Sequence, residues 1–262
     1  MQKFFLTIWM VIIVIGSVSA QDNVSPTLQA QLDGIETATS TIRELDRMEP
    51  TDLAFPTEAE LEDFLQQEFD EEFTTQEFED DLLFYVGLDL MEPDLDLQST
   101  LFDFLLSQIA GFYDPDEDSM NVILLSGEQP DDSIPILESI TYSHEYVHAL
   151  QDQHFDLGKL LDETDESTNG DYQLAVQALV EGDATQAMTQ YTMKLAEDDP
   201  VALAQAVLSA GDDGSLNMPE GVPDIIQTEL LFPYLQGQSF VSQVVDARGW
   251  SAINDAFNGN LP

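Results

Sequence analysis

The spacing of apolar positions predicts that most of this chain is helical. Apolar or small side chains recur every three or four residues, which is the period of one face of an α-helix. The first such stretch covers residues 24–46, with apolar positions at Leu28, Leu32, Ile35 and Ile42. Later stretches predict helices over residues 97–109, 136–153, 172–196, 199–209, 222–231, 234–247 and 250–257.

A strongly acidic stretch that follows the first predicted helix is expected to be helical as well. Thr57 is followed three residues later by Glu60. Such a pair forms the capping box at the start of many helices, and here it predicts a helix over residues 58–69. Half of the residues from Glu58 to Asp81 are acidic, and leucine and phenylalanine recur among them. This pattern indicates amphipathic helices with charged outer faces.

One interval breaks the helical period and predicts a β-hairpin. Two short strand-like runs, 111–113 and 120–125, flank a turn-rich hexapeptide that begins at Asp114. Together with the helices, the hairpin predicts an α+β fold that is mostly helical. We divide the chain at about residue 95 into an acidic helical segment, 21–95, and a compact domain, 96–262.

The charge balance of the chain restricts its partners. There are 52 acidic and 6 basic residues, which give a formal net charge of −46. Nucleic acid is excluded as a partner, because binding phosphates requires the Lys and Arg side chains that this chain lacks. Hydrophobic residues make up 43%, enough for a core. Self-repulsion destabilises the compact state and salt screens it, so we expect a halophilic protein from a saline habitat.

The N-terminus has the pattern of a secretory signal peptide. Lys3 precedes an apolar run, 4–15, and small residues follow up to Ala20. The pattern predicts a signal peptide over residues 1–20, cleaved between Ala20 and Gln21, and hence a secreted protein. Since a bilayer span needs about 20 apolar residues, contact with a membrane is expected only if this segment stays uncleaved. The chain has no cysteine, which excludes disulfides.

The residues that carry chemistry are concentrated in one predicted helix. Residues 144–148 read His-Glu-Tyr-Val-His. Positions i and i+4 of a helix lie about 40° apart, so the imidazoles of His144 and His148 project from one face and can share a metal ion. Zinc lowers the pKa of a bound water towards ~7, and a carboxylate beside it can take the proton. The motif predicts a Zn²⁺ cofactor, with Glu145 as the general base.

Two residues are candidates for the third metal ligand. His154 stands ten residues after His144, the spacing found in metzincins, but Gln151 occupies the position of their chain-turning glycine. If the helix continues, His154 lies about 120° from His148 and does not reach the same ion. Glu181 lies in an apolar, small-residue run on the predicted helix 172–196. A buried carboxylate needs a partner such as a metal ion, so Glu181 is the favoured ligand.

Two segments together resemble the gluzincins, and more narrowly the peptidase-MA-like proteins. They are Tyr142–Gln151, which contains the two histidines, and Val180–Ala184, which matches a Glu-Gly-x-Ala helix that supplies the third ligand in that family. The resemblance begins at about Ala110 and implies a zincin-like domain. It also implies that the hairpin is an edge structure along which an extended substrate lies. Within Phe232–Val241, the resemblance implies that Tyr234 stabilises the oxyanion.

The chain departs from that family in several places. The exopeptidase signature Gly-x-Met-Glu-Asn is absent, so recognition of a free N-terminus is not expected. The long interval between His148 and Glu181 predicts an inserted acidic loop over residues 158–171. Asp183 is a candidate to orient a ligating histidine. The chain ends soon after the helix 250–257, where such a domain is expected to continue, which is the pattern of a truncated fragment.

These features lead to the expectation of a secreted zinc metallopeptidase that hydrolyses a peptide or protein substrate. His144, His148 and Glu181 bind zinc, Glu145 is the base, and Tyr234 stabilises the oxyanion. The alternative is a non-catalytic extracellular zinc- or calcium-binding acidic protein with a structural or binding role. The presence of Glu145 favours catalysis, because a purely structural metal site does not need a carboxylate beside it.

The net charge predicts that salt stabilises the folded protein. Urea unfolding is expected to need more denaturant in about 1–2 M salt than in about 0.05 M salt, because the ions screen repulsion among the carboxylates. Circular dichroism at several salt concentrations measures the midpoint. A midpoint that is independent of salt would contradict the expectation of a halophilic protein.

Overall fold

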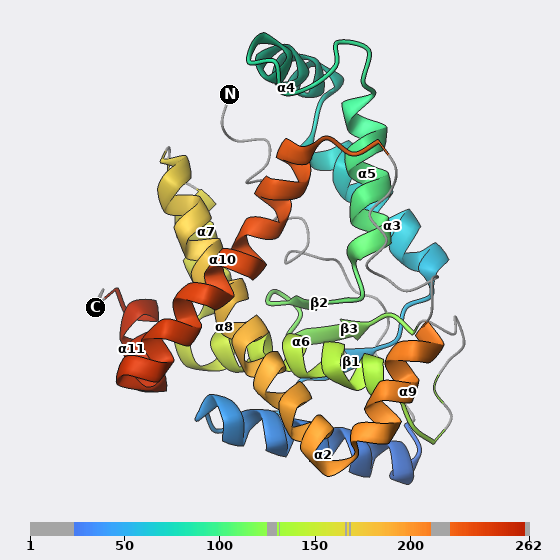
Figure 1. Ribbon diagram of the computed structural model, residues 1–262, viewed down its shortest axis with the longest axis vertical. Helices are drawn as coiled ribbons and strands as arrows, with labels where there is room; N and C mark the ends of the chain where they lie inside the picture. The colour runs from blue at the N-terminus through green and yellow to red at the C-terminus, as the bar shows by residue number, and fades with distance from the viewer. Residues whose placement is uncertain are drawn as a thin grey trace.

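Figure 1 shows the computed structural model of the chain. The structure describes residues 24–124, 130, 132–165, 167, 169–210 and 221–259. The predicted signal peptide, residues 1–20, lies outside the described residues. Among the helices that are described, none has the length and apolar character needed to cross a membrane.

The described chain is mostly helical with one small sheet, which confirms the predicted α+β class. In chain order the elements are α2 (Pro26–Arg43), β1 (Asp52–Ala54), α3 (Glu58–Glu72), α4 (Thr75–Gly87), α5 (Leu97–Gln108), β2 (Gly111–Asp114), β3 (Ser119–Val122), α6 (Ile136–Phe155), α7 (Leu157–Asp165), α8 (Gly170–Asp198), α9 (Pro200–Ala210), α10 (Asp224–Arg248) and α11 (Trp250–Phe257).

The sheet has the strand order β1-β3-β2, with β2 at one edge. β2 and β3 form the predicted hairpin, in which Gly111 pairs with Val122 in antiparallel register. The Oδ1 atom of Asp114 accepts hydrogen bonds from the backbone N–H groups of the two residues that follow Pro115, at 2.9 and 3.2 Å, which holds the turn. β1 pairs with β3 in parallel and was not expected from the sequence, because three residues are too few to show an alternating pattern.

Two hydrophobic clusters organise the helices around the sheet. The first joins α2, α6 and α8, and includes Leu32, Tyr146 and Val180. The second joins α3, α4, α5 and the start of α10, and includes Phe69, Leu101 and Ile226. Figure 1 shows α2 beside α6 at one end of the molecule and α4 at the other. Helices from residues 21–95 thus contribute to both clusters, while the division at residue 95 stays a prediction.

The acidic helices α3 and α4 both begin with a capping box, of which the one at Thr57 was predicted. The backbone N–H of Thr57 donates to Glu60 Oε2 at 2.8 Å, and that of Glu60 donates to Thr57 Oγ1 at 3.3 Å, so the predicted capping box is present. Thr74 and Glu77 form a second box at the start of α4. Each box satisfies backbone N–H groups that a helix start leaves without intrahelical partners.

Two predictions about element boundaries are wrong. The separate helices over 222–231 and 234–247 are one helix, α10, with Pro233 inside it. Proline removes a backbone hydrogen bond, but here the ring is buried and the helix continues by packing against α8. The acidic loop over 158–171 instead contains α7 and the start of α8. Leu157 and Leu161 lie one turn apart and are buried, which anchors α7 despite its acidic residues.

Helices α8 and α10 approach until their backbones touch. A Cβ atom added to Gly182 would lie 2.2 Å from the carbonyl carbon of Gly237. A Cβ atom added to Gly237 would lie 2.1 Å from the carbonyl oxygen of Ala178. Real Cβ atoms do not make such short contacts, so only glycine fits at both positions. This crossing fixes the part of α8 on both sides of Glu181.

We predict that Gly237→Ala lowers the free energy of unfolding by about 1–3 kcal/mol or more, because the new methyl group forces α8 and α10 apart. The matched control is Gly34→Ala in α2, where an added Cβ meets no atom within 4 Å. That substitution is expected to stabilise the protein by about 0.5–1 kcal/mol through helix propensity. Urea unfolding measures both free energies. Equal stability of the two variants would contradict the close crossing.

Candidate metal centre

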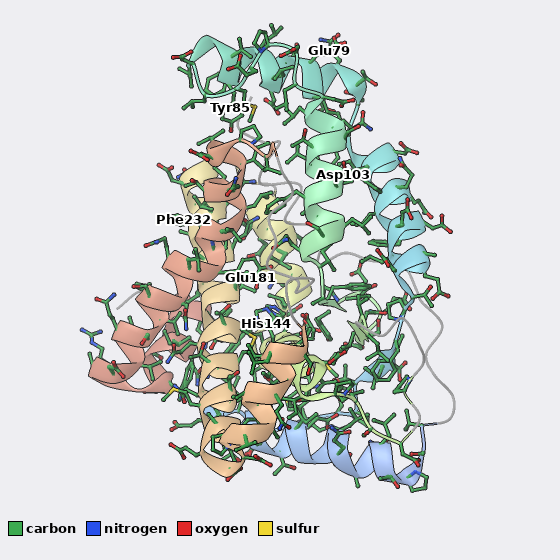
Figure 2. The ribbon with its side chains drawn as sticks, turned by 45° about the vertical axis from the view of Figure 1, so that its right-hand side comes forward. Glu79, Tyr85, Asp103, His144, Glu181 and Phe232 are labelled. Carbon is green, nitrogen blue, oxygen red and sulfur yellow. The ribbon has the colours of Figure 1, made fainter. Side chains whose placement is uncertain are left out.

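Three buried side chains converge between α6 and α8. His144 and His148 lie one turn apart on α6, and Glu181 faces them from α8. Glu181 Oε2 lies 3.1 Å from His144 Nε2 and 3.5 Å from His148 Nε2, and the two Nε2 atoms are 3.2 Å apart. Figure 2 shows His144 and Glu181 near the middle of the molecule. Within the described residues, this is the group of metal-capable side chains that could hold an ion.

Two of the three side chains, His148 and Glu181, have pKa values far from their ordinary values. Burial lowers the pKa of His148, but the neighbouring charge of Glu181 outweighs it and raises the pKa to about 9. Burial raises the pKa of Glu181, but the charge of His148 and hydrogen bonds from both histidines lower it to about 2. At neutral pH the metal-free centre therefore contains a buried His148–Glu181 ion pair.

Glu145 of α6 lies beside this group, and its side chain faces Gly111 at the start of β2. Its side chain is buried, and a Cβ atom added to Gly111 would lie 3.1 Å from Glu145 Cγ. Burial raises the pKa of Glu145, the two neighbouring histidines lower it, and Glu181 raises it again, with a net increase. Glu145 can therefore take up a proton more readily than an exposed carboxylate.

Tyr234 of α10 lies close to His144. Its ring centre lies 6.0 Å from that of His144. Burial, together with the negative charges of Glu181 and Glu145, raises the pKa of Tyr234 well above its ordinary value. The phenol therefore keeps its proton and can serve as a hydrogen-bond donor.

The centre borders a cavity of about 310 Å³. Its polar lining includes His144, Glu145 and Tyr234. Most of the remaining wall is apolar and comes from α5, α8 and α10, through Phe104, Leu105, Met188, Leu230 and Leu231. A small molecule or side chain in this cavity would therefore lie against apolar groups and beside the candidate base.

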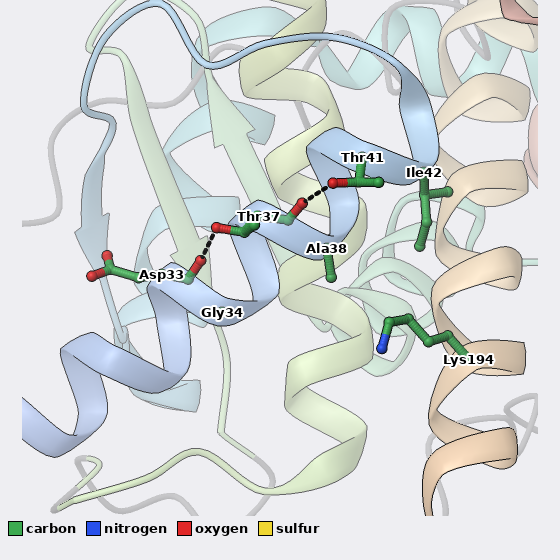
Figure 3. Close-up of a pocket in the computed structure, with 7 residues that line it drawn as sticks. All are labelled: Asp33, Gly34, Thr37, Ala38, Thr41, Ile42 and Lys194. Carbon is green, nitrogen blue, oxygen red and sulfur yellow. Dashed lines mark hydrogen bonds between the residues drawn. The ribbon is translucent and has the colours of Figure 1, made fainter.

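A second hollow, of about 590 Å³, lies between α2 and α8 and contains none of the metal-centre residues (Figure 3). The hydroxyls of Thr37 and Thr41 line it, but each donates to the carbonyl oxygen one turn earlier in α2, at 2.7 Å. Lys194 of α8 also lines this hollow. Its threonine hydroxyls are already used within the helix, and Lys194 Nζ donates to Asp198 Oδ2 at 2.9 Å.

His154 does not join the cluster. Helix α6 continues through Gln151 to Phe155, as the helix former at position 151 predicts. His154 therefore lies at the end of α6, where its Nε2 is 2.7 Å from the backbone oxygen of Asp46. The structure brings Glu181, and not His154, to His144 and His148.

A chain of hydrogen bonds begins at His148 Nδ1 and contains two residues, Gln151 and Arg43, for which the sequence predicted no role in the metal centre. His148 Nδ1 lies 2.9 Å from Gln151 Oε1, and Gln151 Nε2 donates to Asp183 Oδ2 at 3.0 Å. Asp183 thus reaches His148 through Gln151 and not directly. Arg43 of α2 donates to Asp183 Oδ1 at 2.6 Å. The helical period could have indicated that Arg43 is buried, because it continues the face of α2 formed by Leu28, Leu32, Ile35 and Thr39.

No protein-family model, curated protein or solved structure matches this chain. The geometry of the centre therefore carries the functional argument.

We predict that zinc binds more tightly as the pH rises from about 6.5 to about 9, because the metal must displace a proton from His148, whose pKa is about 9. The raised pKa of His148 also makes the stability of the fold depend on pH. The contribution of the His148–Glu181 pair is fully present below the pKa that His148 has in the unfolded chain. It is lost as the pH rises through the folded-state pKa of about 9. Titration calorimetry in buffers of different ionisation enthalpy measures the released protons.

The matched control for this measurement is His154→Gln, which is expected to bind zinc with unchanged affinity and proton release. A zinc affinity of the wild type that does not change over this pH range would contradict the protonated His148.

Proposed function

We propose that the protein is a secreted, zinc-dependent metallopeptidase of the gluzincin type with a zincin-like fold. One observation carries the proposal: a buried His-His-Glu group has a further buried carboxylate, Glu145, beside it, and His144 of the group lines the same cavity as Glu145. His144, His148 and Glu181 would hold the metal, Glu145 would act as general base, and Tyr234 would donate to the oxyanion.

The donor atoms fit zinc. Zinc in proteins prefers nitrogen and carboxylate oxygen at about 2.0–2.2 Å in a tetrahedral arrangement, which separates neighbouring ligand atoms by about 3.3–3.6 Å. The separations of 3.1, 3.2 and 3.5 Å among the two Nε2 atoms and Glu181 Oε2 are close to these edges. Three protein ligands also leave the fourth position free, as in catalytic zinc sites.

The neighbouring residues supply the remaining functions. Zinc in such a site lowers the pKa of water and polarises a carbonyl group. Glu145 has a raised pKa, so it is suited to accept a proton from the attacking water and return it to the leaving amine. Tyr234 remains protonated and can donate a hydrogen bond to the negative charge that develops on the carbonyl oxygen.

The edge strand β2 supports a peptide as substrate. The N–H of Ile123 donates to the carbonyl oxygen of Ala110 at 2.9 Å. Since hydrogen-bonded and non-hydrogen-bonded pairs alternate along antiparallel strands, the N–H and C=O of Gly111 point away from β3. Gly111 also lines the cavity beside Glu145. An extended peptide that pairs with this edge would pass the candidate base, a recognition mode that uses backbone hydrogen bonds.

Burial of Glu145 weighs against the non-catalytic alternative. A structural metal site is satisfied by its ligands, whereas a further buried carboxylate at its edge opposes folding by desolvation. Glu145 is 5% exposed and its pKa is raised by that burial. Such an unfavourable group is typical of a catalytic centre, where a base needs a raised pKa.

We predict that Glu145→Gln binds one zinc per chain, as the wild type does, but cleaves peptides about 10²–10⁴-fold more slowly, because the amide takes up no proton. Metal analysis and mass spectrometry of cleaved unfolded proteins measure the two properties. Glu197→Gln, at an exposed position of α8, is the control and is expected to be fully active.

Three results would count against this proposal. Wild-type protein that binds no zinc, or a Glu145→Gln variant as active as the wild type, would contradict it. Stoichiometric zinc without any peptide cleavage by the wild type would favour the non-catalytic alternative.

A further inference from the structure

An ion pair in the protein core lies behind the metal centre. Arg43 is the last residue of α2, and its Nε donates to Asp183 Oδ1 of α8 at 2.6 Å, with both side chains 0% exposed. The guanidinium also donates to Asn254 Oδ1 at 2.8 Å and lies 4.6 Å from the centre of the Trp250 ring. These contacts fix Arg43 against α8 and α11, so its position is set by the fold.

The amide of Gln151 connects Asp183 to His148. Its Nε2 donates to both Asp183 Oδ2 and the backbone oxygen of Val180, each at 3.0 Å. Both partners are acceptors, so the amide nitrogen must face them and Oε1 must face His148 Nδ1, at 2.9 Å. A carbonyl oxygen only accepts, so His148 Nδ1 carries a hydrogen. The other ring nitrogen, Nε2, is then left to bind a metal beside Glu181.

We propose that Arg43 is a positioning residue of the metal centre, which acts through Asp183 and Gln151 to hold His148 in its metal-binding orientation and tautomer. The inference rests on the proposed function, because it assigns the role to a zinc site. It extends that site to α2, since one link of the chain of contacts comes from the N-terminal segment. Removal of residues 21–95 as a prosegment would remove this link.

His144 has no comparable support from the described residues, which increases the importance of the contacts to His148. His144 Nδ1 is buried and has no hydrogen-bond partner in the described part of the structure. Of the two histidines, His148 is therefore the one whose ring is oriented by a hydrogen bond from behind. Loss of such outer contacts typically weakens metal binding by 10–100-fold.

The test measures zinc affinity of the folded proteins by competition with a chelator. Arg43→Met and Gln151→Met are each expected to weaken zinc binding about 10–100-fold. The double variant is expected to be no weaker than Gln151→Met alone, because both changes interrupt one chain of contacts. Substitution with Co²⁺ adds a spectroscopic readout: the visible absorption of the cobalt protein is expected to change in Arg43→Met.

Arg47→Met is the matched control, because Arg47 lies four residues after Arg43, beyond the end of α2, and its Nη1 donates to Glu36 Oε2 at 2.6 Å. Its zinc affinity and cobalt spectrum are expected to equal those of the wild type. If Arg43→Met does not fold because Asp183 is left unpaired, Arg43→Met combined with Asp183→Asn removes both charges and is still expected to bind zinc more weakly than the wild type.

An Arg43→Met protein with wild-type zinc affinity and an unchanged cobalt spectrum would overturn the positioning role while leaving the zinc site intact. The Arg43→Met, Asp183→Asn double variant would overturn it in the same way if it binds zinc as tightly as the wild type. Wild-type protein that binds no zinc would instead overturn the proposed function itself.

Discussion

The buried carboxylates of α8, Glu181 and Asp183, are the constraint on which this structure depends. A charged carboxylate in a protein core destabilises the fold by several kcal/mol unless a cation or hydrogen-bond donors accompany it. The chain has 52 acidic residues but only 6 lysines and arginines, so cations for this purpose are scarce. Arg43 accompanies Asp183, and the two histidines accompany Glu181. The interior between α2, α6 and α8 is arranged around these pairs.

This arrangement couples the architecture to the proposed chemistry. Contact between Gly182 and Gly237 brings α10, and with it Tyr234, towards the same segment of α8 that carries Glu181. Gly111 leaves room for Glu145 where the edge strand begins. Residues without reactive side chains therefore determine how closely the candidate ligands, base and phenol approach. The N-terminal helix takes part through Arg43, so the centre depends on elements from most of the chain.

The sequence predicts local features well and long-range contacts poorly. The register of His144, Glu145 and His148 follows from helical geometry alone, and the presence of Glu181 in an apolar run indicates a buried partner. Gln151 and Arg43 make contacts across helices that are distant in sequence. The periodicity of α2 indicates that Arg43 is buried, but no local pattern shows which residue it pairs with. The continuity of α10 through Pro233 is also a tertiary effect, because packing against α8 overrides the local preference of proline. For β1, pairing with a strand far along the chain determines the structure.

Diffraction at the zinc absorption edge is the decisive measurement of whether His144, His148 and Glu181 hold one zinc ion. Crystals grown from zinc-equilibrated protein are predicted to show one strong anomalous peak, about 2.0–2.2 Å from the Nε2 atoms of both histidines and from the carboxylate of Glu181. A map without a peak between α6 and α8, or with zinc bound only by surface carboxylates, would contradict this zinc site.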